Sequence, residues 1–515
     1  MAPRRMARRR LAQKPGKKPV IGGPARPVRD YSSGSSTGGT SRSSDEDDSS
    51  SDECSDEDDP RDYKRGGYHP VMPYQLYNAR YRVLSKLGAG AFSTVWLCAD
   101  EKTPANRPEG PDLVAMKVCK SKKSVTEQAL DEILLLDRLQ EGTSRSDHVV
   151  QMRGHFWHSG PFGRHKCMVF EVMGENLLAL VKHHDYNGLP VNMCRKLAHH
   201  TLIGLEYIHA RDVIHTDVKL ENVLVERHDI AELLKEARQA HKAFTDQRQG
   251  VDGLSKSQKK RMKKKAKNAK SKVDAEVEEV EDCDAADATE GAAEAAPAAE
   301  KPEGDMSAED QAAAQACGRP VPPVRQRDRF DTLQSDKIFA KLADFGNGCQ
   351  ADKKVTDEIQ TRQYRSPEVI IGTKWDETAD VWSAACMFFE LLTGDFLFDP
   401  RTGKDWSRDE DHLALMIELL GDHPPKEWAL SGKYSRDFFS PAGKLKHIKS
   451  LKFWSLPEVL GQKYSMTDEQ AEEVSSFLLP MLRWEPAKRQ SAAEALKHPW
   501  LYKWDEEADE EDEED

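Results

Sequence analysis

The sequence of 515 residues has no apolar run near the roughly 20 residues that a membrane-spanning helix needs, and its Arg-rich start lacks the apolar stretch of a secretory signal. Its nine cysteines include no Cys-x-x-Cys pair and no zinc-ligand spacing, and an odd number does not suit a disulfide framework. Aromatic residues make up only 7% of the chain and charged residues 32%, so parts of it cannot bury enough apolar surface to fold. We therefore expect a soluble intracellular protein in a reducing compartment, with one folded domain and long disordered additions.

Charge is distributed unevenly along the chain. The net charge of −13 hides a basic stretch at residues 1–30 and acidic stretches at 45–59 and 505–515. Residues 32–59 are mostly Ser, Gly, Asp and Glu, which favours disorder throughout residues 1–65.

A second stretch, residues 229–335, has no sustained apolar periodicity. It contains a lysine cluster (Lys259–Lys272) and a run of Asp, Glu and Ala at 274–303. We predict a disordered insert here, although residues 230–244 can form a helix at its start. Residues 504–515 are predicted to be an acidic tail.

The remaining sequence predicts an α+β fold with two lobes. Alternating apolar residues begin at Tyr81, and strand-like segments follow at 94–97, 114–119 and 167–172. Leucines at helical spacing predict a helix over residues 128–139. We expect a small β-rich lobe over 66–174 and a larger helical lobe over 175–228 and 336–503, with its clearest helices at 193–209 and 378–393.

Residues 215–222 read HTDVKLEN and resemble the catalytic loop of protein kinases, His-Arg-Asp-x-x-x-x-Asn. In that pattern the Asp orients a substrate hydroxyl and the Asn holds a magnesium ion, roles that match Asp217 and Asn222. Lys219 matches the lysine with which serine/threonine kinases neutralise the transferring phosphate, so serine/threonine specificity is favoured. Thr216 stands where the pattern has Arg.

Three further motifs follow the order of the protein-kinase pattern. Residues 87–95 read LGAGAFSTV and resemble a Gly-rich loop in which Ser93 replaces the third glycine. Lys117, in the segment VAMK, matches the lysine that contacts ATP phosphates, and Glu132 is its expected ion-pair partner. Asp344, in Asp-Phe-Gly, matches the magnesium-binding aspartate. These roles together predict phosphoryl transfer that uses ATP and Mg²⁺.

Supporting residues of a protein kinase also have counterparts. Glu368, in Ser-Pro-Glu, resembles the end of an activation segment, and the family pairs this Glu with an Arg, here Arg489. Asp380 resembles the aspartate that braces the catalytic loop from a central helix.

Longer phrases resemble the SR-protein kinases, which phosphorylate serines in the Arg-Ser repeats of splicing factors. The phrases are DYKRGGYHPV (62–71), FSTVWL (92–97), HTD (215–217), QTRQYRS (360–366) and RDEDH (408–412). The resemblance covers about residues 62–228 and 335–503, and a long insert between them is also typical of that family. This chain departs from the family at Leu220 and Phe345, where Pro and Leu are usual, and in a shorter insert.

The resemblance implies an ATP site in which Phe170 is the gatekeeper. Its expected members are Leu87, Gly88, Ala89, Gly90, Ala91, Phe92, Ser93, Val95, Ala115, Lys117, Phe170, Glu171, Met173 and Leu224.

The resemblance also implies an acidic substrate groove at Asp395, Asp411 and Glu418, with Lys452 as a lone cation. Carboxylates along a channel would attract and align an Arg-rich peptide through charge-assisted hydrogen bonds. The alternative is a solvated acidic helix face. We expect the neighbouring Asp409 and Glu410, like the acidic tail, to be merely solvated.

Thr216 predicts activity without activation-loop phosphorylation. The usual Arg beside the catalytic Asp is neutralised by a phosphorylated loop, and a Thr at this position removes the need for that phosphate.

The sequence also allows other interpretations of the protein's function. A LAMMER-type dual-specificity kinase shares splicing-factor substrates, and a non-catalytic scaffold with a kinase fold could bind basic peptides. The cluster Lys259–Lys272 can serve nuclear import, docking or nucleic-acid binding. We expect Arg-Ser-rich protein partners, a monomer in the cytoplasm and nucleus, and no direct contact with nucleic acid or membrane.

Overall fold

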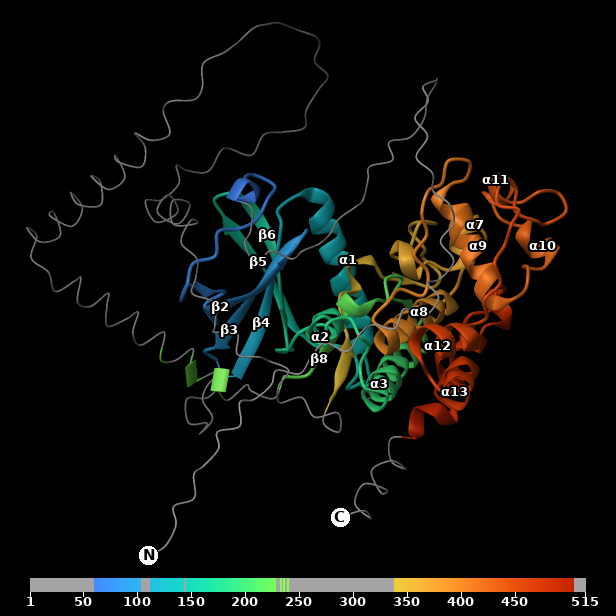
Figure 1. Ribbon diagram of the computed structural model, residues 1–515. Helices are drawn as coiled ribbons and strands as arrows, with labels where there is room; N and C mark the ends of the chain where they lie inside the picture. The colour runs from blue at the N-terminus through green and yellow to red at the C-terminus, as the bar shows by residue number, and fades with distance from the viewer. Residues whose placement is uncertain are drawn as a thin grey trace, which may run out of the picture. The chain divides into compact units, whose positions relative to one another are not determined.

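The computed structural model describes residues 60–102, 112–142, 145–227 and 338–503, with residues 232, 233, 235, 236 and 239. These residues form two compact units (Figure 1). The strand-rich unit contains the described residues of 60–185 and 196–355, and the helical unit contains 186–195 and 356–503. No helix in these described ranges is long and apolar enough to cross a membrane.

An antiparallel sheet of six strands, in the order β1-β2-β3-β4-β6-β5, forms the frame of the strand-rich unit. The strands are β1 (Leu76–Tyr77), β2 (Tyr81–Gly90), β3 (Ser93–Asp100), β4 (Asp112–Cys119), β5 (Met152–Gly160) and β6 (Gly163–Phe170). Side chains alternate between the two faces of a strand, so every second apolar residue joins the same core. Trp96, Met116 and Val169 lie in one such buried cluster.

Helix α1 (Lys123–Gln140) contacts β4, β6 and the 3-10 turn η3 (Phe345–Asn347) (Figure 1). Its buried face follows the helical period, since residues three or four positions apart lie on one side. The buried apolar residues of the helix are Val125, Ala129, Ile133, Leu135, Leu136 and Leu139. Glu132 is buried on the same helix, with 3% of its surface exposed. A buried carboxylate is stable only with a hydrogen-bonding or oppositely charged partner, so Glu132 indicates a charged site beside α1.

Two short ladders join segments that are far apart in the sequence. Strand β8 (Val223–Val225) pairs with β9 (Ala340–Leu342), and β7 (Val213–Ile214) pairs with β10 (Cys349–Gln350). The turn η2 (Leu220–Asn222) leads into β8, and η3 follows β9. The catalytic loop and the Asp-Phe-Gly segment are consequently held together by antiparallel pairing. Helix α2 (Leu177–His183) and α3 (Val191–His209) from Lys196 onward complete this unit.

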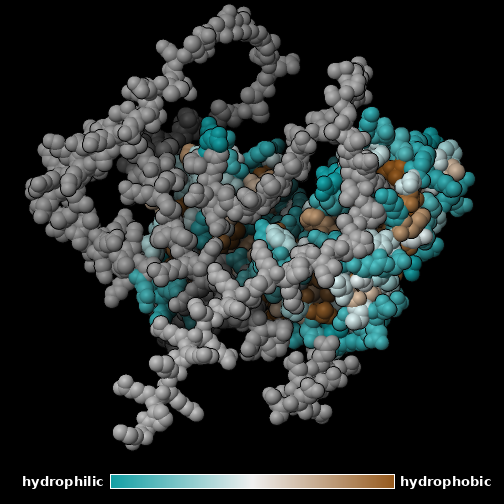
Figure 2. All heavy atoms as spheres, in the orientation of Figure 1, coloured by the Kyte–Doolittle hydropathy of each residue, from teal (hydrophilic) through white to brown (hydrophobic). Residues whose placement is uncertain are grey.

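Helix α8 (Thr378–Thr393) is the centre of the helical unit, and all its residues are buried. It ends at Gly394, whose φ of +77° suits glycine and whose added Cβ would meet the Tyr186 carbonyl oxygen at 1.9 Å. The other helices of this unit are α7 (Pro367–Ile371), α9 (Arg408–Leu420), α10 (Lys426–Ala429), α11 (Ser435–Phe438), α12 (Leu456–Tyr464), α13 (Asp468–Leu478) and α14 (Ala492–Ala495). Figure 2 shows mainly hydrophilic residues on the described surface in view, with a few hydrophobic patches.

The α+β fold with a strand-rich part and a helical part is confirmed, and the predicted helix at 378–393 has the same bounds as α8. Strand β5 was missed, because only every second residue of its polar sequence is turned inward. Residues 60–65 belong to the described chain and include η1 (Pro60–Asp62), so the prediction of disorder up to residue 65 extended too far. The predictions for residues 1–59, the acidic tail and nearly all of 229–335 lie outside the described residues.

Candidate active site

Lys117, Glu132 and Asp344 meet in the strand-rich unit. The Lys117 Nζ atom lies 3.0 and 2.9 Å from the two carboxylate oxygens of Glu132 and 3.2 Å from Oδ1 of Asp344. Burial alone lowers the pKa of Lys117, but the carboxylates of Asp344 and Glu132 outweigh burial and raise it. Lys117 in turn lowers the pKa of Asp344. Burial raises the pKa of Glu132, and Lys117 opposes this rise. The two carboxylates hold the Lys117 ammonium in a fixed position.

The sheet register explains why several predicted ATP-site residues share one face. Val95 lies opposite Lys117, and Ala115 lies opposite both Leu97 and Phe170. Opposed residues of an antiparallel sheet point to the same side, as do residues two positions apart on one strand. Val95, Ala115, Lys117 and Phe170 therefore lie on one face of the sheet.

A small apolar cluster brings further predicted ATP-site residues together. Met173 is buried with Val150 and Ala343, and Phe170 and Leu224 pack against them. Leu87 to Gly90 form the end of β2, and Ala91 and Phe92 form the turn to β3, with Gly90 paired to Ser93. The fourteen residues expected to bind ATP thus come from the β2–β3 hairpin, β4, the end of β6 and β8, all in one unit.

Glu171 has a side-chain partner that the sequence did not predict. Its carboxylate oxygens accept hydrogen bonds from Lys341 Nζ at 3.0 and 2.9 Å, and Oε1 also accepts one from the Gln151 N–H at 2.9 Å. Because Lys341 and Gln151 already bind the Glu171 carboxylate, an adenine would contact Glu171 through its backbone groups. The sequence did contain a signal for this ion pair, because Lys341 stands inside the apolar segment FAKLA, where an unpaired charge would be energetically costly.

The catalytic loop holds Asp217 between a cation and two amides. Lys219 Nζ lies 3.1 Å from Oδ2 of Asp217, and Asn222 Nδ2 donates to the Asp217 carbonyl oxygen at 2.8 Å and to Oδ2 at 3.2 Å. Asn347 Nδ2 approaches the same Oδ2 at 3.5 Å. Burial lowers the pKa of Lys219, but Asp217, Glu221 and Asp344 together outweigh burial and raise it. Asp217 is thus fixed in orientation, as a group that must align a hydroxyl requires.

Thr216 has left-handed backbone geometry, with φ of +65°, and its hydroxyl donates to the Asn347 carbonyl oxygen at 2.8 Å. His215 lies 3.0 Å from the Ala343 carbonyl oxygen through Nε2, and its Nδ1 accepts the Asp217 N–H at 3.3 Å. Both residues join the catalytic loop to the segment around Asp344. A φ in this region is unfavourable for a β-branched residue and persists only where neighbouring contacts hold it.

Asn222 and Asp344 are the candidate metal ligands. The Asn222 carbonyl oxygen accepts the N–H of Ala343, the residue before Asp344, at 2.9 Å. The described residues contain no group of three His, Cys, Asp or Glu side chains that could enclose a metal ion. One amide and one carboxylate instead fit a divalent cation that completes its coordination with phosphate oxygens and water.

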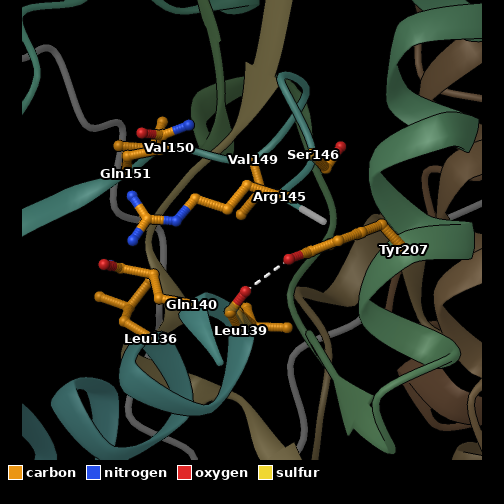
Figure 3. Close-up of a pocket in the computed structure, with 9 residues that line it drawn as sticks. All are labelled: Leu136, Leu139, Gln140, Arg145, Ser146, Val149, Val150, Gln151 and Tyr207. Atoms are coloured by element: carbon orange, nitrogen blue, oxygen red, sulfur yellow. Dashed lines mark hydrogen bonds between the residues drawn. The ribbon is translucent and has the colours of Figure 1, made fainter. Parts of the chain in front are cut away.

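Anchors at the end of α1 hold Glu132 in place. The Tyr207 hydroxyl donates to the Leu139 carbonyl oxygen, beside a cavity of only about 10 Å³ (Figure 3). Arg138 donates through Nε to the Arg211 carbonyl oxygen at 2.7 Å and pairs with Asp212 at 2.8 Å. A cavity of this size holds at most one water molecule, so the helix end is tightly packed.

The helical unit contains the predicted supporting pair. Arg489 forms two parallel hydrogen bonds with Glu368, Nη1 to Oε1 and Nη2 to Oε2, each 2.7 Å long, and neither side chain is exposed. Arg489 also donates to the carbonyl oxygens of Thr378 and Arg483. Asp380 is fully buried in the first turn of α8, and its bracing role stays a prediction.

The residues predicted for a substrate groove all lie in the helical unit, and their role in substrate binding stays a prediction. Asp411 is fully buried and accepts the Arg401 N–H at 2.9 Å, and Glu418 accepts the Lys452 N–H at 2.9 Å. Asp395 pairs with Lys463 Nζ at 2.8 Å and accepts the Tyr464 hydroxyl at 2.9 Å. None of the four predicted groove residues lines the cavity of about 680 Å³ in this unit.

Asp409 and Glu410 border that cavity, so the prediction that these two acids are merely solvated was wrong. Glu410 is buried and accepts the N–H groups of His447 and Ile448 at 2.6 and 3.2 Å, while Asp409 pairs with Arg362. Its charged lining residues are Glu358, Arg365, Lys404, Asp405, Asp409, Glu410 and Asp437. His447, the partner of Glu410, lies 37 residues away in the sequence, so motif spacing could not predict this contact.

The fold together with the clusters around Lys117 and Asp217 defines a protein kinase. The chain matches the family model of the protein kinase domain over residues 81–235 and 332–501 and belongs to this family. It is 38% identical to "Serine/threonine-protein kinase SRPK" of Physarum polycephalum over 87% of this chain and 92% of that protein. It is 39% identical to human "SRSF protein kinase 3" over 87% of this chain and 90% of that protein, and 38% identical to "Protein kinase dsk1" of Schizosaccharomyces pombe over 86% and 85%.

The chain therefore belongs to the SR-protein kinase family and is a serine/threonine protein kinase. As a protein kinase it uses ATP and a divalent metal ion.

Proposed function

We propose that this kinase transfers the γ-phosphoryl group of Mg²⁺-bound ATP to serines in Arg-Ser-rich proteins, such as splicing factors. The observation that carries the proposal is the similarity to relatives named SRSF protein kinase over 87% of the chain. The acidic border of the cavity in the helical unit supports it independently.

Each charged group near Asp217 has a chemical task. Asp217 orients the serine hydroxyl and accepts its proton, and Lys219 neutralises charge on the transferring phosphoryl group. Lys117 binds the other phosphates, and Glu132 holds it in place at 2.9 Å. Asn222 and Asp344 provide hard oxygen ligands, which suit Mg²⁺ when nucleotide phosphates supply further ligands.

Charge complementarity favours a basic substrate. The cavity lining has five carboxylates, Glu358, Asp405, Asp409, Glu410 and Asp437, against two strongly basic side chains, Arg365 and Lys404. A cavity with this excess of acid concentrates arginine-rich segments through its field. Asp395 adds an acid with a half-exposed side chain in the same unit.

A kinase assay that compares Arg-Ser, Lys-Ser and Ser-Pro peptides tests the substrate class. We expect kcat/KM to be highest for the Arg-Ser peptide, because only the guanidinium binds a carboxylate through two parallel hydrogen bonds. D217N, which keeps the size of the side chain, is the inactive control. A preference for Ser-Pro would refute the proposal, and comparable phosphorylation of tyrosine would favour the LAMMER-type alternative.

The same assay separates an enzyme from a scaffold. A chain that binds the Arg-Ser peptide with no turnover above the D217N control would be a non-catalytic kinase fold. The connected clusters of Lys117 and Asp217 argue for turnover.

We further propose that the kinase is active without phosphorylation of its activation loop. Thr216 offers no cation for a loop phosphate and instead bonds to the Asn347 carbonyl oxygen. Tyr207 and Arg138 also anchor α1, the helix that carries Glu132, and neither contact depends on a phosphate. This anchoring is a second argument for activity without loop phosphorylation. Phosphatase treatment should leave the turnover of enzyme expressed in bacteria intact, and a large loss would contradict this proposal.

We propose that the protein is a monomer distributed between cytoplasm and nucleus and that Lys259–Lys272, outside the described residues, promotes nuclear import. Deleting about residues 235–330 should shift a fluorescently tagged chain to the cytoplasm. An unchanged distribution would exclude the import role. Light scattering at increasing concentration tests the monomer.

A further inference from the structure

Residues 62–69 form a tight turn beside the Gly-rich loop of the strand-rich unit. Gly66 has φ of +82°, and a Cβ on Gly67 would meet the Asp62 carbonyl oxygen at 1.9 Å, so both positions require glycine. The turn is closed by the Tyr68 N–H, which donates to the Asp62 carbonyl oxygen at 3.0 Å. These constraints account for the glycine pair in the phrase DYKRGGYHPV, to which the catalytic mechanism assigns no role.

The turn places Tyr68 against the loop that precedes β3. The Tyr68 hydroxyl donates to the Gly90 carbonyl oxygen at 2.6 Å, and only 6% of Tyr68 is exposed. Lys120 lies over the Tyr68 ring, with Nζ 4.1 Å from its centroid, and pairs with Asp62 at 3.0 Å. The backbone N–H of Lys120 donates to the carbonyl oxygen of Phe92 at 2.9 Å. Two carbonyl groups of the loop are thus held by one cluster.

A second anchor fixes the turn itself to the sheet. His69 is buried, its Nε2 lies 2.9 Å from the Tyr77 hydroxyl, and its ring stands where a Cβ on Gly160 would be, 2.3 Å from Nδ1. The Ser121 N–H donates to the Gly67 carbonyl oxygen at 3.1 Å. Because the turn is tied to β5, β6 and the end of β4, Tyr68 is a stationary support and not a side chain that follows the loop.

We propose that Tyr68 is a positioning residue that sets nucleotide affinity by fixing the Gly-rich loop. In a planar trans peptide the C=O and N–H groups point in opposite directions. The bond from Tyr68 to the Gly90 carbonyl therefore orients the Ala91 N–H to the opposite side. Backbone N–H groups of this loop are the groups that contact ATP phosphates in protein kinases, so a loop held in advance loses less entropy when nucleotide binds.

The test is Tyr68→Phe in the full-length chain. Phenylalanine keeps the ring that contacts Lys120 and removes only the hydroxyl. Loss of one neutral hydrogen bond should raise the dissociation constant of ADP with Mg²⁺, measured by calorimetry, by about 2- to 12-fold. The KM for ATP should rise by a similar factor, while the KM for a peptide substrate changes by less than about twofold.

Tyr502→Phe is the matched control. The Tyr502 hydroxyl also donates to a backbone carbonyl oxygen, that of Leu496 at 2.7 Å, but it lies in the helical unit. We expect Tyr502→Phe to leave ADP affinity unchanged. Unchanged ADP affinity in Tyr68→Phe would overturn the proposal, as would an equal loss in both variants, which would indicate general loosening. Since nucleotide binding is measured without a protein substrate, failure of the Arg-Ser preference would leave this result unaffected.

Discussion

Substitution of Thr216 by valine tests whether a threonine can stabilise the catalytic loop in place of the usual arginine. Thr216 is 2% exposed, and its hydroxyl is 2.8 Å from the Asn347 carbonyl oxygen. Valine has the same shape and removes this hydrogen bond, and because Asn347 is an exposed residue the loss is that of an ordinary hydrogen bond, about 0.5–1.5 kcal/mol. Asn347 also approaches Oδ2 of Asp217 through its side chain, so a shift of Asn347 disturbs the catalytic aspartate directly.

If the loss of this hydrogen bond destabilises only the active conformation, kcat/KM for phosphorylation of an Arg-Ser peptide should fall roughly 2- to 12-fold. Steady-state assays of T216V, with and without phosphatase treatment, measure this loss. The KM for ATP should change much less, because Thr216 lies in the catalytic loop and Lys117 is untouched.

Thr201→Val provides the matched control for this substitution. Thr201 is 1% exposed and donates to the Leu197 carbonyl oxygen at 2.8 Å, but it lies within α3. We expect it to lower stability slightly and to leave kcat unchanged. Wild-type activity in T216V would refute the structural role of the hydroxyl, and an equal loss in T201V would show that any buried threonine matters.

Two further predictions concern charged pairs, one buried and one with an exposed carboxylate. Glu368→Gln should lower the unfolding free energy by about 3 kcal/mol in urea denaturation, because it leaves the Arg489 charge buried without its counter-ion; a change below about 1 kcal/mol would contradict this. Lys117 holds the pKa of Asp344 below its usual 3.8, so the pair stabilises the fold above the unfolded pKa and loses this effect as pH falls through the folded pKa. Below about pH 4 the wild-type chain should therefore lose more unfolding free energy than D344N, and parallel pH profiles would exclude the coupling.

The proximity of the candidate catalytic residues could be predicted from the sequence because their motifs follow the order of the protein-kinase pattern. Lys117 and Asp344 are 227 residues apart, yet the structure brings Nζ and Oδ1 within 3.2 Å. The motif HTDVKLEN specified the neighbours of Asp217, and its departure at Thr216 pointed to a contact that the structure contains. The Glu368–Arg489 pair was likewise accessible from its motif.

The environment of acidic side chains could not be predicted in the same way. Asp411 and Glu418 share one face of α9, but spacing does not tell whether neighbouring loops cover that face. In the structure the backbone N–H groups of Arg401 and Lys452 bind these carboxylates. Glu410, one residue from Asp411, faces His447 on another segment. Which acids border a cavity therefore depends on tertiary packing and not on the helical period.

The long insert leaves the catalytic centre intact because of where it enters. About 110 residues separate Arg227 from Ile338, and loop-closure entropy grows only with the logarithm of length. Even a connection without structure of its own would cost only about 2 kcal/mol more than one of about 10 residues. The pairing of β8 with β9, in register from Val223 and Leu342 to Val225 and Ala340, provides the contacts that offset this cost. Since Asn222 directly precedes β8 and Ala343 alone separates β9 from Asp344, the ladder that closes the insert also sets the distance between the two candidate metal ligands.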